Sequence, residues 1–368
     1  MIYSELESKR FKAKIFRDKI NDFKTKDLQQ ELIKNDADIA IIRLPSNKLY
    51  LLSKLDIIGF PYIVADTLVY YECKFNNYLP KALRNVELEF EKCTSQHGNL
   101  IEELTGKIFP NYISHYNSNP FLDKKLILDG YKEWARGYTA TEGKVVFLVK
   151  KNGIDIGFAT CSWDNDTKKC EGVLYGVLPE YSGGGVYSDI IRYTQEYFRK
   201  QGFEKMIVST QTQNIAVQKV WNREGFELTE SYNTIHVNCM LNKSTRKIEV
   251  ERIEITDELI DKLSNDLNPI HFNEYIAKEK GFEGRIAHGL IPSLIISKYF
   301  GTQFPGVRTD FLNYKYLFYM PLYLGRTYKI QYQFPDYVEN FKVLSVVVKV
   351  LDSENNLCLL SYNQIIKR

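Results

Sequence analysis

A short polar and basic stretch at 241–249 separates two parts of this 368-residue chain that differ in their pattern of apolar and amphipathic segments. In the part before it, apolar runs typical of buried strands alternate with amphipathic segments at helical spacing, such as 187–202, which ends on a glycine. The apolar runs lie at 144–150, 175–179 and 205–210. A strand, a glycine turn, a helix and another strand in succession predict an α/β arrangement.

The part after the stretch predicts a different arrangement. A helical segment rich in His, Asn and Gly comes first, and strand-like runs follow, with a turn at 352–356. These runs lie at 328–334, 342–351 and 357–366. We therefore expect an α/β (α+β) protein of two domains, over 1–243 and 250–368, in which the second has one buried helix and several antiparallel strands.

Charge and hydropathy exclude several classes of function. The chain has 49 Lys and Arg against 46 Asp and Glu, a net charge of +3, and so lacks the clustered basic excess that a nucleic-acid binder needs. No run approaches the ~18 uninterrupted apolar residues of a membrane span. The charged start at 1–16 has no apolar leader segment. We therefore expect no nucleic-acid partner and no membrane partner.

The cysteines and histidines predict a cytoplasmic protein without a metal. The six cysteines are scattered, without the close spacings of zinc sites or disulfide frameworks, so we expect reduced thiols. No two of the five histidines have the i, i+4 spacing of a helical metal site.

Three consecutive glycines, 183–185, lie directly after an apolar strand and directly before an amphipathic helix. Glycines let the backbone approach a ligand closely, and the start of a helix presents free N–H groups at the positive end of its dipole. This arrangement can cradle a pyrophosphate, although three glycines alone are more often a flexible turn. The following strand and short helix, with Asn214 and Trp221, favour the pyrophosphate site.

Residues 144–240 resemble the acetyl-CoA-binding core of the GNAT N-acyltransferase family. The residues that carry the resemblance are Val177, Pro179, Ser182, Gly185 and Tyr187 in the first motif and Asn214, Trp221, Gly225 and Phe226 in the second. By this resemblance the backbone of Val177 pairs with the pantetheine arm of coenzyme A. The resemblance also implies that the pyrophosphate is held by the amides of Gly183, Gly184, Gly185, Val186 and Tyr187.

Two upstream segments, 65–75 and 115–138, are similar to the nucleotide-sugar branch of that family, the dTDP-fucosamine N-acetyltransferase-like enzymes. The resemblance implies an N-terminal half over 1–135 and an acyl-CoA-binding core over 136–243. It further implies that the acceptor is a dTDP-linked amino sugar and that the reaction serves lipopolysaccharide or glycan biosynthesis.

The candidate catalytic residues of the transferase are Glu171, Asn214 and Trp221. Trp221 stands where the family has a Tyr that protonates the leaving thiolate, and an indole N–H does not give up its proton at neutral pH. Water or Tyr232 would then be the acid, or none is needed, because a thiol has a pKa of roughly 8.5. Glu171 is a candidate base for the attacking amine, with a solvated strand-end carboxylate as the alternative. Ser182 and Tyr187 depart from the family pattern and predict a reshaped coenzyme A pocket.

A second constellation, Asp-x-Asn-Pro-x-His, occupies 266–271. A carboxylate and an imidazole five residues apart, with a Pro-constrained turn between them, can converge on one water molecule. Asp266 would orient the water and help to deprotonate it, while His271 exchanges protons with a substrate carbon. Taken singly, Asp266 would more often be a cap and His271 a core histidine.

The segment that follows, 272–300, resembles the MaoC-type hot-dog proteins, which include the (R)-specific enoyl-CoA hydratases. The resemblance implies catalytic roles for Asp266, Asn268 and His271. It also implies that the amide of Gly289, in a His-Gly pair before the central helix, is an oxyanion-hole donor. Asn273 departs from the family signature, and we expect it to cap the next helix; Arg326 is a second departure.

Together the two resemblances predict a transferase of short acyl groups fused to an enoyl-CoA hydratase. The transferred group would be 3-hydroxybutanoyl, coenzyme A esters would be the substrates, and the hot-dog domain would make a homodimer. Two alternatives remain open. One is a hydratase whose first domain is not catalytic, and the other is a transferase whose hot-dog domain only dimerises and binds acyl-CoA.

Overall fold

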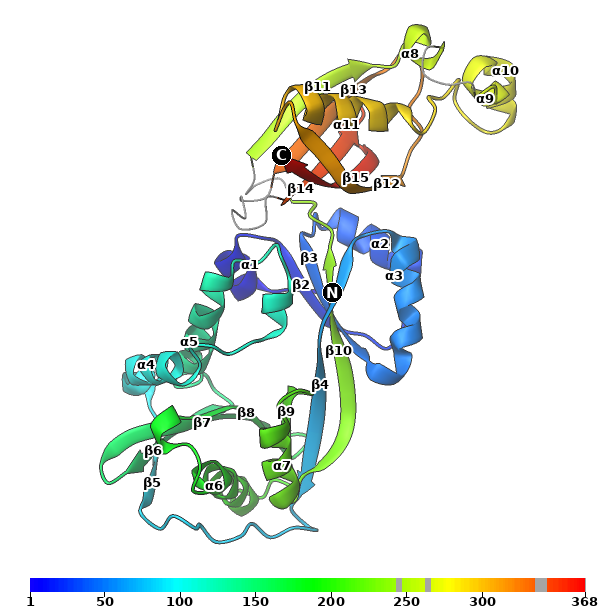
Figure 1. The fold of residues 1–368 in the computed structure, drawn as a ribbon. Coiled ribbons are helices and arrows are strands. Elements are labelled where there is room, and N and C mark those ends of the chain that lie inside the picture. The colour runs from blue at the N-terminus through cyan, green and yellow to red at the C-terminus, as the bar shows by residue number, and fades with distance from the viewer. Residues whose placement is uncertain (243–246, 262–265, 335–342, 368) are drawn as a thin grey trace. The chain divides into compact units, whose positions relative to one another are not determined.

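The computed structural model describes residues 1–242, 247–261, 266–334 and 343–367. The chain divides into two compact units, unit 1 (Met1–Cys239) and unit 2 (Met240–Arg368) (Figure 1).

Unit 1 is built on one mixed sheet of ten strands in the order β1-β2-β3-β10-β4-β9-β8-β7-β6-β5. The strands are β1 (Ile2–Tyr3), β2 (Ile15–Lys19), β3 (Ile39–Pro45), β4 (Tyr62–Lys74), β5 (Leu88–Lys92), β6 (Lys144–Lys151), β7 (Ile154–Asp164), β8 (Lys169–Val177), β9 (Lys205–Gln211) and β10 (Glu227–Asn238). Only β2 with β3 and β8 with β9 run parallel. The last strand, β10, inserts between β3 and β4 and so joins the two ends of the unit.

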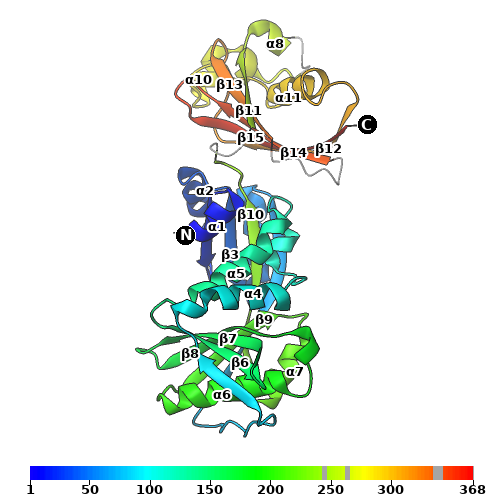
Figure 2. The same cartoon turned by 90° about the vertical axis from the view of Figure 1, so that its left-hand side faces the viewer.

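Helices cover both faces of the sheet (Figures 1 and 2). They are α1 (Glu5–Phe11), α2 (Thr25–Lys34), α3 (Leu52–Ile58), α4 (Gly98–Ile108), α5 (Ile127–Gly137), α6 (Val186–Lys200) and α7 (Ile215–Arg223). The strand β6 shows why its sequence is an unbroken apolar run. Val145 and Phe147 pack in the cluster formed with α6 and α7, while Val146 and Leu148 pack in the cluster formed with α4 and α5. A strand buried on both faces needs apolar residues at every position.

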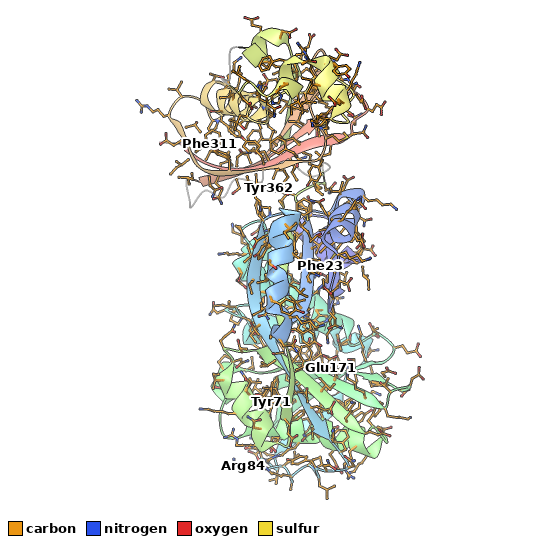
Figure 3. All side chains as sticks on the ribbon, turned by 90° about the vertical axis from the view of Figure 1, so that its right-hand side faces the viewer. Phe23, Tyr71, Arg84, Glu171, Phe311 and Tyr362 are labelled. Carbon is orange, nitrogen blue, oxygen red and sulfur yellow. The ribbon has the colours of Figure 1, made fainter. Side chains whose placement is uncertain are left out.

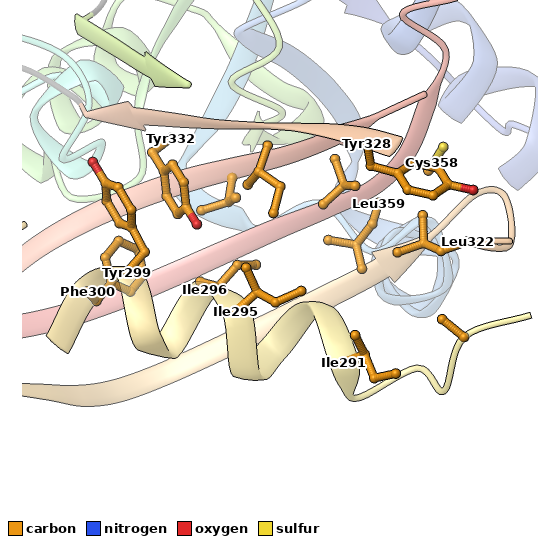
Figure 4. Close-up of a cluster of buried hydrophobic side chains, with 14 of the residues drawn as sticks. Ile291, Ile295, Ile296, Tyr299, Phe300, Leu322, Tyr328, Tyr332, Cys358 and Leu359 are labelled. Atoms are coloured by element: carbon orange, nitrogen blue, oxygen red, sulfur yellow. The ribbon is translucent and has the colours of Figure 1, made fainter. Parts of the chain in front are cut away.

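Unit 2 has five antiparallel strands in the order β11-β13-β14-β15-β12. Its elements are β11 (Lys247–Glu254), α8 (Asp257–Asp261), α9 (Pro269–Phe272), α10 (Glu274–Glu279), α11 (Ile291–Thr302), β12 (Thr309–Phe318), β13 (Thr327–Phe334), β14 (Val343–Leu351) and β15 (Leu357–Lys367). The buried residues of α11 lie on one face that packs on the sheet (Figure 4), while the apolar Leu294 is exposed. In this core Tyr299 stacks on Tyr332, with ring centroids 3.6 Å apart.

The structure confirms the expected fold class, a large mixed sheet in the first part and a separate antiparallel sheet in the second. The amphipathic segment 187–202 forms α6, and the runs 144–150 and 205–210 form β6 and β9. Asn273 caps α10, as expected, because its side-chain oxygen accepts a hydrogen bond from the Ile276 amide at 3.1 Å.

Candidate functional site

In unit 2, the segment 266–271 folds into two successive side-chain-capped turns. The Asp266 carboxylate accepts a hydrogen bond from the Asn268 amide at 3.0 Å, and the Asn268 side chain accepts one from the Ile270 amide at 3.3 Å. Asn268 therefore acts as the N-cap of α9, with Pro269 in the first turn. These turns bring His271 back toward Asp266, with His271 Nε2 3.7 Å from Asp266 Oδ2.

The hydrogen bonds of His271 fix its tautomer. Its Nδ1 lies 2.7 Å from the Ile286 carbonyl oxygen, and a carbonyl can only accept, so Nδ1 carries the proton. In the neutral ring Nε2 is then a lone-pair acceptor directed at Asp266. The side chain is buried, whereas 55% of the Asp266 side chain is exposed. The pair therefore joins an ordered base to a carboxylate that faces solvent.

A second imidazole, that of His288, completes the cluster. Its Nε2 donates to the Asp266 backbone carbonyl at 3.1 Å, and its Nδ1 is buried without a hydrogen-bond partner among the described residues. The His271 and His288 rings lie 3.8 Å apart between centroids. The sequence singled out His288 only as half of a His-Gly pair, and the structure adds that its ring stacks on the predicted base.

These three side chains line or adjoin a cavity of about 360 Å³. Its apolar wall suits an acyl chain and consists mainly of Phe282, Ile286, Ala287, Phe318, Met320 and Leu322. Gly289 also lines the cavity, two residues before α11 begins. Within the described residues its N–H has no acceptor, so it is available to a ligand.

The same three side chains raise the question of a metal. One oxygen of Asp266 and one ring nitrogen each of His271 and His288 lie within 4.8 Å of one another. With the carboxylate ionised and both imidazoles neutral, all three atoms are acceptors, which suits a water molecule that donates two hydrogens as well as a cation.

We expect chelation to leave the cluster functional. Because an activated water needs only the Asp266 and His271 acceptors, prolonged incubation with EDTA should change the rate of enoyl-CoA hydration less than about twofold, in contrast to a metal-activated water. The measurement is hydration of crotonyl-CoA before and after chelation, with metal content determined on the same sample. A rate lost on chelation and restored by one added metal would contradict the expected absence of a metal.

In unit 1, the glycine turn has the backbone that its sequence predicted. Gly183, Gly184 and Gly185 all have positive φ, at 93°, 58° and 90°. The turn closes through a hydrogen bond from the Val186 amide to the Gly183 carbonyl at 3.2 Å, so four of the five predicted pyrophosphate-binding amides remain without a backbone acceptor. These N–H groups lie at the N-terminus of the 15-residue helix α6.

A buried ion-pair network holds this turn in place. Asp189, in the first turn of α6, accepts hydrogen bonds from the backbone amides of Arg84 and Asn85, each at 2.9 Å. Arg192 bridges Asp189 and Glu224, and its two bonds to Glu224 are each 2.9 Å. The segment before β5 is thereby tied to α6 and to the end of α7. It also places the exposed Arg84 side chain beside Gly185 (Figure 3 labels Arg84), a cation that no motif in the sequence had indicated.

The strands β8 and β9 separate next to this turn. Their parallel pairing extends only from Lys169 with Lys205 to Gly172 with Val208, although β8 continues to Val177. The pairing of β7 with β8 shifts register at the same point, which marks a β-bulge. An opening between two parallel strands leaves backbone groups free to pair with an extended ligand, and Val177 lies on its edge.

Glu171 pairs with Ile207 of β9, one residue before the pairing of β8 with β9 ends (Figure 3 labels Glu171). Burial raises the pKa of the Glu171 carboxyl, and Lys169, Arg43 and Lys19 nearby oppose this rise. A carboxyl with a raised pKa is a stronger base than an exposed one.

The other predicted transferase residues make contacts within the fold. Trp221 is buried in the cluster beneath α6 and α7, with its indole N–H near the Tyr187 phenol oxygen. Asn214 precedes α7 and donates to the Thr210 hydroxyl at 3.1 Å. The Tyr187 side chain packs in the same cluster as Trp221, where burial raises the pKa of its phenol. Tyr232 lies elsewhere, on β10, with its hydroxyl 3.3 Å from Glu230.

A larger cavity of about 620 Å³ lies where β4 ends, at Lys74, and β9 begins, at Lys205. Its walls include Lys74, Phe75, Arg199 and Phe203. None of the predicted site residues reaches it.

Comparison with known proteins shows what each part of the chain is similar to. Residues 107–226 match the model of the acetyltransferase (GNAT) family, and residues 242–356 match that of the MaoC like domain. The two similarities follow one another along the chain in the order of the two units.

Individual relatives are similar over short segments. The chain is 40% identical over 65 residues to an (R)-specific enoyl-CoA hydratase of Rhodospirillum rubrum, which covers 18% of this chain and 45% of that protein. It is 31% identical over 106 residues to a mitochondrial 3-hydroxyacyl-(acyl-carrier-protein) dehydratase of Arabidopsis thaliana, covering 27% of this chain and 60% of that one. The chain thus spans about half the length of these relatives. Among solved structures, a GCN5-related N-acetyltransferase from Sphaerobacter thermophilus superposes with a TM-score of 0.39 and 11% identity, over 56% of this chain and 62% of the other.

No helix among the described residues combines the length and the apolar character needed to cross a bilayer.

Proposed function

We propose that unit 2 hydrates a 2-enoyl-CoA to an (R)-3-hydroxyacyl-CoA and that unit 1 transfers a short acyl group from coenzyme A to the amine of a nucleotide-linked amino sugar. The observation that carries the proposal is the convergence of His271 Nε2, Asp266 and His288 at an apolar cavity.

The hydrogen-bonding pattern supports a specific order of proton transfers. Because Nδ1 of His271 is held by the Ile286 carbonyl, Nε2 starts as a base and takes a proton from a water that Asp266 orients. The water oxygen bonds to C3 of the enoyl thioester while the C2–C3 double bond opens. The His271 imidazolium, stabilised by the Asp266 carboxylate, then returns the proton to C2 of the enolate. One water is consumed, and both residues end as they began.

Gly289 is placed to stabilise the enolate oxygen. Its free amide lies in the cavity wall near the N-terminus of α11, whose dipole favours negative charge there. Asn268 contributes by capping α9 and so orienting His271, a positioning role rather than a catalytic one.

In unit 1, the proposal is supported by three features in one region. The glycine turn has amides that would bind a pyrophosphate, the separation of β8 and β9 leaves backbone groups that would pair with a pantetheine arm, and Glu171 lies where that separation begins. There Glu171 would take the proton as the amine nitrogen bonds to the thioester carbon. The C–S bond then breaks and coenzyme A leaves as a thiolate, so no acid is required of Trp221.

The proposed role of Glu171 predicts a pH dependence. The base must be ionised, so kcat for acyl transfer should fall as the pH falls through the raised pKa of Glu171, at a higher pH than for an ordinary glutamate. Glu171→Gln should lower kcat by roughly 100-fold and remove this acid limb. The matched control is Glu89→Gln, an exposed carboxylate on β5, which should leave both unchanged. An acid limb that persists in Glu171→Gln would assign the base elsewhere.

The two activities are chemically suited to act in sequence, since the product of hydration is an acyl-CoA. We therefore propose that the transferred group is 3-hydroxybutanoyl and that fusion raises the effective concentration of the donor. Incubation of the full chain with crotonyl-CoA and a dTDP-linked amino-deoxysugar should yield an amide one water heavier than the crotonyl amide, detected by mass spectrometry.

The control for this coupling is His271→Ala. It should fail to make the hydroxylated amide from crotonyl-CoA and should make it from 3-hydroxybutanoyl-CoA supplied ready-made. If the wild-type protein transfers only acetyl groups, the proposed acyl group is wrong, while the transferase activity itself stands.

A homodimer through unit 2 is also part of the proposal. Among the described strands of unit 2, the edge strand β12 pairs with β15 alone, and it exposes Leu312, Tyr314 and Phe318 by more than half. A long edge with exposed apolar residues favours pairing with a second copy.

A further inference from the structure

Four polar residues form a transverse row across the middle of the unit 1 sheet. Lys19 on β2 lies opposite Arg43 on β3, Arg43 opposite Thr234 on β10, and Thr234 opposite Asp66 on β4. Side chains that are directly opposite on adjacent strands project from the same face. A cation, a second cation, a hydroxyl and a carboxylate therefore stand side by side on one face of the sheet.

Two tyrosines flank the transverse row. Arg43 Nη1 donates to the Tyr70 hydroxyl at 3.0 Å, and Lys19 Nζ lies 3.8 Å from the centroid of the Tyr232 ring. The two rings meet edge to face, 5.4 Å apart. Half of the Lys19 side chain is exposed, so the row is open to solvent at this end.

The inner end of the row has unused hydrogen-bonding capacity. Arg43 Nε is buried without a hydrogen-bond partner among the described residues. The Asp66 carboxylate is stabilised by the Thr234 hydroxyl, Arg43 and Gln211, which oppose the rise in its pKa that burial causes. A buried donor without a partner is rare in folded proteins because it costs free energy. The Arg43 guanidinium therefore has a donor that a polar ligand or water can engage.

The transverse row shares its face of the sheet with Glu171. Alternation along β4 places Asp66 and Tyr70 on the face opposite to Val69 and Tyr71, which pack under α6 and α7. On β8 the neighbour of Glu171, Cys170, packs under α6 and α7 as well, so Glu171 projects to the same side as Tyr70. Both Arg43 and Lys19 lie close enough to Glu171 to act on its charge. Glu171, next to the last pair of β8 with β9, therefore lies on this polar face.

We propose that Lys19 and Arg43, flanked by Tyr70 and Tyr232, bind the diphosphate of a nucleotide-linked acceptor and so direct its amine toward Glu171. This inference rests on the proposed transferase function and adds the position of the acceptor. Arg binds phosphate oxygens through a planar fork and Lys as a point charge. Lys19 Nζ also lies 3.8 Å from the exposed Glu230 carboxylate, which the diphosphate would displace. The half-buried Tyr70 supplies a surface for a base or a sugar, whereas the Tyr232 ring is buried against Lys19.

The test is titration of thymidine diphosphate into the full chain saturated with coenzyme A, which occupies the pyrophosphate site of the glycine turn. Lys19→Gln and Arg43→Gln should each weaken thymidine diphosphate binding by roughly 10-fold or more, as expected for a lost charge-assisted hydrogen bond. Coenzyme A affinity should change less than twofold. Lys9→Gln, which removes the same charge from the exposed face of α1, is the matched control and should behave as wild type.

The outcomes separate this inference from the function on which it rests. If acyl transfer proceeds and both variants keep the wild-type acceptor KM and thymidine diphosphate affinity, the acceptor site is wrong while the transferase stands. If thymidine diphosphate binding depends on Arg43 and Lys19 but no amine is acylated, the site stands and the transferase function fails. Arg43→Lys and the melting temperature of each variant are controls for misfolding. A folded Arg43→Lys variant that restores most of the affinity for thymidine diphosphate supports the site. An Arg43→Lys variant that binds no better than Arg43→Gln overturns it, as does a loss of affinity that follows a loss of stability.

Discussion

His271→Ala should lower kcat for hydration of crotonyl-CoA by roughly 1,000-fold, within the range that a general acid–base contributes. The variant removes the ring nitrogen that lies 3.7 Å from the Asp266 carboxylate, so that a bound water loses its base and C2 loses its proton donor. The measurement is the initial rate of loss of the enoyl thioester, followed spectrophotometrically at saturating substrate.

The matched control lies two residues away. Asn273→Ala removes the N-cap of α10 and should cost about 1 kcal/mol of stability, yet it should leave kcat within about threefold, because Asn273 does not line the cavity. A His271→Ala variant that keeps more than a tenth of wild-type kcat while folded would assign the base to another residue, with His288 as the next to replace.

Gly185→Asp should weaken coenzyme A binding to unit 1 by more than about 100-fold, since like charges brought together cost several kcal/mol. Gly185 has a φ of 90°, and a Cβ there would lie 3.5 Å from the Arg84 side chain. The new carboxylate would therefore repel the pyrophosphate and also engage the cation beside it. The measurement is the affinity for coenzyme A in a titration of the full chain.

Gly202→Asp provides a control for backbone strain. Gly202 has a φ of 81° with open space around its Cβ position, beyond the far end of α6. It carries the same unfavourable left-handed conformation, about 1–2 kcal/mol, without any charge near the turn. Equal loss of affinity in both variants would show that strain, not the ligand, explains the effect, and that the site is misplaced.

Local sequence motifs were sufficient where a site is built from one continuous segment. The spacing of Asp266 and His271 predicted their convergence, because two side-chain-capped turns lie between them. The conformation of the glycine turn could also be predicted from the sequence, since positive φ at three consecutive positions is possible without strain only for glycine.

No local pattern in the sequence predicted the row of polar residues that strand register brings together. Lys19 and Arg43 become neighbours through the pairing of β2 with β3, whereas Arg43 and Asp66 flank Thr234 only because β10 inserts between β3 and β4. A shift of one residue in that pairing would move Thr234 to the other face, and no local pattern encodes the register of so distant a pair. The motif also marked Asn268 as catalytic, which stays a prediction, and its side chain is the N-cap of α9.

The central position of β10 has a consequence for how the protein is made. This 12-residue strand is the last of unit 1 to leave the ribosome, and until it does β3 and β4 each present an unpaired edge. At roughly 5–20 residues per second, those edges stay open for roughly 10 to 40 seconds after β3 is synthesised. Nascent chains therefore pass through an interval in which aggregation competes with folding, and the arrival of a single strand ends it.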